Sequence, residues 1–146
     1  MKAAIIYASK TGNTEELAIE VRERLSRHMH TDLYPVGQFP LSRLNEYEVM
    51  VIGTYTWGMG DIPLEMMSLY KWIERENVNH LITGVFGTGD RFYPDFCGAV
   101  DEFRDMLYVH TNLAATLKVE LSPQSRDLEK CGKFAAILMN RTKQLA

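Results

Sequence analysis

The sequence predicts an α/β fold in which a doubly wound, five-stranded parallel sheet carries helices on both faces. Short apolar runs alternate with segments of helical periodicity along the 146 residues. No repeat, low-complexity tract or shift in composition marks a linker. Because alternating strands and helices form parallel sheets through right-handed crossovers, residues 1–146 are expected to form one domain.

The first half of the chain supplies three of the predicted strands. Residues 3–8 are continuously apolar, which is typical of a strand buried on both faces. The helix predicted over 13–29 places Leu17, Val21 and Leu25 on one face. A strand at 31–36, which Pro35 assigns to a sheet edge, is followed by a short helical turn at 41–45 and a central strand at 49–54.

The second half of the chain continues the alternation. Pro63 suits the first turn of a helix whose apolar side chains recur from Met66 to Ile73. Strands are predicted at 81–86 and 117–121, with a helix around Phe103 between them. The final helix presents an apolar face that ends at Leu138. The sequence therefore predicts five strands and four main helices.

Composition excludes several classes of function. A net charge of -3 provides no basic field for nucleic acid or anionic lipid. No apolar run approaches the ~20 residues of a membrane span, and the first residues lack a signal-peptide pattern. Cys97 and Cys131 are too few for a disulfide framework, and His28 and His30 are expected to close the first long helix. We expect a cytoplasmic protein that binds neither metal, nucleic acid nor membrane.

The loop after the first strand has the character of a phosphate site. Parallel sheets bind ligands beyond the carboxyl ends of their strands, and a helix start offers free N–H groups to an anion. The loop is also consistent with an ordinary helix cap and turn glycine. The Lys10 side chain is expected to be solvated. The loop resembles the flavodoxin pattern Ser/Thr-x-Thr-Gly-x-Thr, which implies that its hydroxyls and amides bind FMN phosphate without requiring a cationic side chain. The residues concerned are Ser9, Lys10, Thr11, Gly12, Asn13 and Thr14.

Two further loops are rich in aromatic residues and glycine. The loop after the third strand sets Trp57 beside Gly58, although a tryptophan there also suits a lid over the core. The loop after the fourth strand is similar to the flavodoxin segment Gly-x-Gly-Asp-x-x-Tyr-x-x-Phe-Cys. Every specified position of that segment is present, as Gly87, Gly89, Asp90, Tyr93, Phe96 and Cys97.

The resemblance to flavodoxins covers essentially the whole chain and implies roles for these loops. Trp57 and Tyr93 would stack on the two faces of the isoalloxazine ring of FMN. Cys97 would pack beneath the ring, and the peptide after Trp57, made mobile by Gly58, would accept a hydrogen bond from N5–H of the reduced flavin. The other cofactor-binding residues implied are Thr54, Tyr55, Thr56, Thr88, Gly89, Asp90 and Phe96.

The function implied is that of a low-potential one-electron carrier, not an enzyme, which shuttles electrons between a flavodoxin/ferredoxin reductase-type donor and redox-enzyme acceptors. A monomer that docks transiently is expected. Asp61, Asp90 and Asp95 should disfavour an anionic reduced flavin, whereas Arg91 could offset part of their charge. The short segment before the last helix leaves no room for the insertion of long-chain flavodoxins, so the short-chain class is expected.

Three other readings stay open at this point. A flavodoxin-like flavoprotein that activates class Ib ribonucleotide reductase shares the FMN loops. A flavin-dependent quinone reductase requires larger loops and hydride transfer from NAD(P)H. A phosphorylatable receiver shares the fold but needs an aspartate at the end of the third strand, where this chain has Ile52, Gly53 and Thr54.

Overall fold

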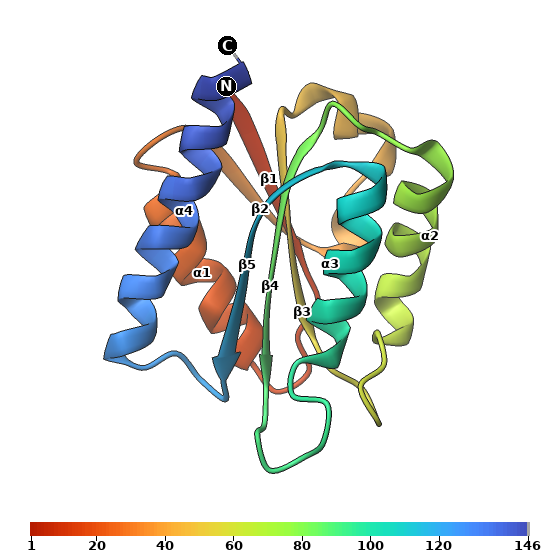
Figure 1. Cartoon of the computed structure of the whole chain (residues 1–146), viewed down its shortest axis with the longest axis vertical. Helices are drawn as coiled ribbons and strands as arrows, with labels where there is room; N and C mark the ends of the chain where they lie inside the picture. The colour runs from red at the N-terminus through yellow and green to blue at the C-terminus, as the bar shows by residue number, and fades with distance from the viewer. Residues whose placement is uncertain (146) are drawn as a thin grey trace.

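The computed structural model describes residues 1–145 and contains one five-stranded parallel sheet. The strands are β1 (Lys2–Tyr7), β2 (His30–Pro35), β3 (Val49–Tyr55), β4 (Ile82–Gly89) and β5 (Asn112–Glu120). The long helices are α1 (Asn13–Leu25), α2 (Met67–Glu76), α3 (Gly98–His110) and α4 (Ser125–Leu145). In Figure 1, α1 and α4 cover one face of the sheet and α2 and α3 cover the other. The predicted fold class is confirmed.

The strand order is β2-β1-β3-β4-β5, with every neighbouring pair parallel. The chain therefore reverses its direction of travel across the sheet between β1 and β3. The carboxyl ends of the strands, and the loops that follow them, lie at the edge of the sheet opposite the two termini (Figure 1). Pro35 lies at the end of edge strand β2, as predicted.

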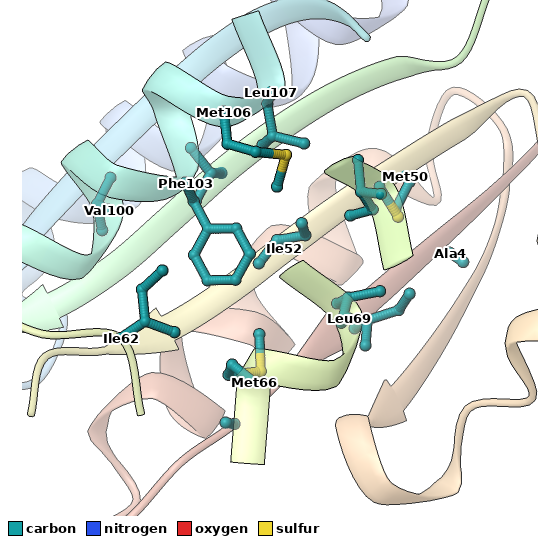
Figure 2. Close-up of a cluster of buried hydrophobic side chains, with 14 of the residues drawn as sticks. Ala4, Met50, Ile52, Ile62, Met66, Leu69, Val100, Phe103, Met106 and Leu107 are labelled. Atoms are coloured by element: carbon teal, nitrogen blue, oxygen red, sulfur yellow. The ribbon is translucent and has the colours of Figure 1, made fainter. Parts of the chain in front are cut away.

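Apolar side chains form one core on each face of the sheet. Figure 2 shows the core beneath α2 and α3, where Phe103 and Met66 meet Ile52 of β3. The core beneath α1 and α4 contains Phe86 and Phe134, whose rings pack edge to face with centroids 6.2 Å apart. Full burial of side chains of this size stabilises the fold by about 1.5–3 kcal/mol each. The loops at the carboxyl ends of the strands are therefore attached to a well-packed sheet.

Helix α1 is shorter than predicted. It ends at Leu25, and a turn follows in which the Met29 N–H donates to the Leu25 carbonyl over 3.1 Å. Met29 is buried in the same core as Leu25, so the apolar periodicity continues after the helix has ended. The assignment of His30 to the end of this helix was wrong, because His30 is the first residue of β2.

The other differences also lie at element ends. Strand β5 begins at Asn112 instead of 117, because its first half is a partly exposed edge with an irregular register against β4. Leu121 lies outside β5 with φ of 55°. The turn predicted at 41–45 is a 3-10 helix, Leu41–Glu46, and Pro63 precedes another, Leu64–Met66, that leads into α2.

Candidate functional site

The loop between β1 and α1 already has the geometry of an anion site. The Ser9 hydroxyl accepts hydrogen bonds from the N–H groups of Gly12, at 3.2 Å, and Glu15, at 3.3 Å. Gly12 caps the helix with φ of 97°, a conformation that glycine adopts without strain. The N–H groups of the first turn therefore converge on one small oxygen, and phosphate oxygens suit the same donors.

A buried hydroxyl pair joins this loop to the end of β4. The hydroxyl oxygens of Thr14 and Thr88 lie 2.7 Å apart, and the two side chains are 1% and 4% exposed. The sequence assigned Thr14 to the phosphate and Thr88 to the pyrimidine edge of FMN. The structure brings these two positions together, so the loop after β1 and the end of β4 are joined directly.

The loop after β3 holds Trp57 in a tight turn. The N–H and carbonyl of Trp57 exchange hydrogen bonds with those of Asp61 over 2.8 and 2.7 Å. Gly58 and Gly60 within the turn have φ of 54° and 99°. The indole is 51% exposed, so Trp57 is not a lid folded into the core. Its side chain is available to stack on a planar ligand.

The turn that carries Trp57 is locked against the start of α3. An added Cβ on Gly98 would lie 2.8 Å from the Cα and the carbonyl oxygen of Gly60. The Ala99 N–H donates to the Thr56 hydroxyl over 3.2 Å. Because two glycines allow this backbone contact, the second and third loops form one unit.

These loops enclose a cavity of about 570 Å³, the size of a small-molecule site. Tyr93, 63% exposed, lies on its rim with Trp57. The predicted residues that line it are Lys10, Thr11, Asn13, Tyr55, Thr56, Trp57, Gly58, Thr88, Gly89, Asp90, Tyr93, Phe96 and Cys97. The predicted residues of the cavity thus come from the ends of three strands, β1, β3 and β4.

Four predicted residues lie outside the lining of this cavity. Ser9 lines a neighbouring groove instead, whereas Gly12, Thr14 and Thr54 line neither the cavity nor that groove. The sequence did not assign Pro94, Asp95 and Leu121, which do line the cavity. Leu121 could have been found from the rule that every carboxyl strand end meets at this edge, since it follows β5 and its N–H donates to the Gly89 carbonyl over 2.8 Å.

Burial governs the protonation of two groups at the site. Burial raises the pKa of the Cys97 thiol to about 11, so the thiol is neutral and unreactive at physiological pH. Burial, aided by the hydrogen bond that Tyr55 donates to Glu65 over 2.8 Å, raises the pKa of the Tyr55 phenol to about 12. Within residues 1–145 no group of three or more His, Cys, Asp or Glu side chains could hold a metal ion.

The donor set fits FMN. Loop N–H groups at a helix start suit the phosphate, two exposed aromatic side chains suit a planar ring system, and the cavity between them crosses the point where the sheet order reverses. The flavodoxin-like strand order is itself a known example of this rule, with FMN bound at the reversal between β1 and β3. Fold and site together define a protein of the doubly wound class that binds a phosphorylated aromatic cofactor.

Comparisons with known proteins agree. The flavodoxin family model matches residues 5–133. The chain is 40% identical to "Probable flavodoxin 1" of Bacillus subtilis over 139 residues, which cover 92% of this chain and 87% of the relative. It superposes on a Streptococcus pneumonia TIGR4 flavodoxin with a TM-score of 0.90 at 35% identity, covering 97% and 99% of the two chains. An oxidised flavodoxin 1 from Bacillus cereus gives a TM-score of 0.87 at 32% identity, with 96% and 98% covered.

The chain belongs to the flavodoxin family. It is an FMN-containing electron carrier and not an enzyme, and it works with redox-protein partners. Along residues 1–145, no helix combines the length and apolar character that crossing a membrane requires.

Proposed function

We propose that this chain is a monomeric, low-potential one-electron carrier whose FMN phosphate is held by residues 9–14 and whose isoalloxazine ring lies between Trp57 and Tyr93. The observation that carries the proposal is the single cavity lined by all three loops, with both aromatic side chains exposed on its rim. Bound FMN supplies the reversible one-electron chemistry that no side chain of this site offers.

The chain's own residues bind and orient the cofactor. The N–H groups that converge on Ser9 Oγ supply donors for the phosphate. Backbone groups at Thr88, Gly89 and Asp90 are proposed to bond the pyrimidine edge, and Cys97 to pack as a neutral thiol below the ring. The peptide at Gly58, whose φ of 54° would strain any residue with a side chain, is proposed to reorient and to accept a hydrogen bond from N5–H of the reduced ring.

Acidic residues support a low potential for the second electron. Asp90 and Asp95 line the cavity, and Asp61 forms the base of the Trp57 turn. One carboxylate ~10 Å from a developing negative charge, at an effective dielectric of about 20, opposes it by roughly 1.7 kcal/mol, or ~70 mV for one electron, before screening by solvent. We propose that these carboxylates keep the reduced carrier strongly reducing.

The partners proposed are a flavodoxin/ferredoxin reductase-type donor and redox-enzyme acceptors, which dock transiently at the exposed loop edge. Trp57, Met59 and Phe92 are exposed there by 51%, 72% and 86%. Both cysteines are free, as expected in the reducing cytoplasm where we place the carrier.

The test is a visible absorbance spectrum of the purified protein, followed by stepwise anaerobic reduction and FMN titrations of variants. Each stacking contact contributes about 0.5–1.5 kcal/mol beyond the burial of apolar area. Loss of stacking alone in Tyr93→Ala should therefore raise the dissociation constant for FMN by about 2-fold to 13-fold, and loss of buried area adds to this. Tyr108→Ala is the matched control, because Tyr108 is a 77% exposed tyrosine on α3 away from the cavity. Equal affinity of the two variants would refute the proposed ring position.

A further inference from the structure

Lys10 holds a charge directly against the proposed stacking residue. Its Nζ lies 4.0 Å from the centroid of the Trp57 ring, in cation–π contact. Lys10 also lines the FMN cavity and, with Glu65, the neighbouring groove of about 720 Å³. The side chain is exposed, as the sequence predicted for a solvated lysine, but its ammonium group is placed by the indole.

The charge of Lys10 lacks a compensating carboxylate within the part of the chain that the structure describes. None of the ion pairs within 4.0 Å among residues 1–145 includes Lys10. Arg91 differs, because its Nε lies 3.8 Å from Glu120 and its guanidinium covers the Phe96 ring at 4.3 Å. Arg91, the cation predicted from the sequence to offset part of the aspartate charge, is therefore already paired with Glu120.

Both ends of the contact are held in place. The backbone beside Lys10 is fixed by Ser9, whose hydroxyl accepts two N–H groups of the following turn. The backbone that carries the indole is fixed by the paired hydrogen bonds between Trp57 and Asp61. With both backbones fixed, the cation–π contact places the ammonium group beside the indole at the mouth of the cavity.

We propose that Lys10 tunes the potential of this carrier, by opposing the cavity aspartates with a positive charge beside the flavin ring. The inference rests on the proposed ring position against Trp57. The oxidised ring is neutral and the fully reduced ring is an anion, whereas the charge of the FMN phosphate does not change on reduction. A cation at the ring therefore favours the reduced state, and a cation at the phosphate favours both states equally.

The test is Lys10→Gln, which removes the charge and retains a polar side chain. Dissociation constants of oxidised and reduced FMN are measured for wild type and variant, together with the potentials from anaerobic titration. Coulomb attraction at ~10 Å, reduced by solvent screening, predicts that the reduced form is weakened by about threefold to tenfold more than the oxidised form. A tenfold change in this ratio lowers the two-electron midpoint potential by about 30 mV, or the potential of the second electron by about 59 mV when the first is unchanged.

Riboflavin and a control variant separate the possible causes. Riboflavin lacks the phosphate, so the same redox-dependent loss is expected with it if Lys10 acts on the ring. Lys143→Gln removes a lysine charge in the last turn of α4, at the end of the helix away from the cavity loops, and should leave the ratio unchanged.

Two results would overturn the inference. Equal weakening of both redox states with FMN, together with no effect on riboflavin, would make Lys10 a phosphate ligand. A ratio for Lys10→Gln no different from that of Lys143→Gln would remove its tuning role. The ring position itself is tested separately, since Tyr93→Ala and Tyr108→Ala of equal FMN affinity would refute the proposed function instead.

Discussion

The contact between Gly98 and Gly60 provides a sharp test of how the flavin loops are held. In Gly98→Ala the new Cβ would lie 2.8 Å from the Cα and oxygen of Gly60, whereas carbon atoms pack favourably at about 3.5–4.0 Å. The obstructing atoms are backbone, so no side chain can rotate away. Overpacking of this kind costs about 1–3 kcal/mol, which exceeds the gain of at most ~1 kcal/mol for replacing glycine in a helix.

Gly132→Ala is the matched control, because Gly132 lies inside α4 and an added Cβ meets no atom within 4 Å. That variant should gain about 0.5–1 kcal/mol in the free energy of unfolding. Urea denaturation of the FMN-free proteins should therefore move in opposite directions for the two variants.

The loop contact also predicts an effect on the cofactor. In Gly98→Ala the Trp57 loop can move away and so relieve the clash. FMN binding then requires the loop to return to its place, which restores the strained contact. A strain of about 1.4 kcal/mol raises the dissociation constant by tenfold, which flavin-fluorescence titration resolves. A Gly98→Ala protein as stable as Gly132→Ala, with the wild-type affinity for FMN, would refute this account of the loops.

Two further predictions concern stability. Phe103→Ala should lower the free energy of unfolding by about 3–5 kcal/mol, because it leaves a cavity in the core. Phe92→Ala, at an 86% exposed position, should change this free energy by no more than about 0.5 kcal/mol. Similar losses for the two variants in urea denaturation would contradict the assigned core. A hydrogen bond from the Tyr47 hydroxyl holds the pKa of the Asp32 carboxyl below its usual value. The ionised carboxylate therefore stabilises the fold at pH values above the unfolded pKa of about 3.9, and this stabilisation is lost as pH falls through the lower, folded pKa. The stability difference between wild type and Asp32→Asn should accordingly vanish in acid, and a pH-independent difference would refute the charge as its cause.

The fold was predictable because strands buried on both faces leave a strong signal. The continuous apolar run of β1 and the period of α1 indicate their elements without tertiary information. The ends were less predictable, because the chain leaves a helix for tertiary reasons. Met29 continues the apolar period of α1 after Leu25 since the same core buries both residues, and β5 carries polar residues at an exposed edge.

The lining of the candidate site was predictable where aromatic side chains mark the loops, as with Trp57 and Tyr93. It was less predictable where the backbone does. The Gly98 contact and the Thr14–Thr88 hydroxyl pair depend on loops that are distant in the chain and meet only in the folded sheet. The pairing of Arg91 with Glu120 is likewise invisible in the sequence, where the two residues are 29 positions apart.

These long-range contacts share one consequence for FMN binding. The Thr14–Thr88 pair, the Ala99–Thr56 hydrogen bond and the hydrogen bond from Leu121 to the Gly89 carbonyl join the carboxyl ends of β1, β3, β4 and β5 through contacts within the chain itself. Ordering loops on binding costs about 0.5–1.5 kcal/mol for each immobilised side chain. Loops joined in this way avoid much of that cost for every redox state of FMN. Differences in affinity between those states then depend on the charges that face the ring, such as Asp90, Asp95 and Lys10.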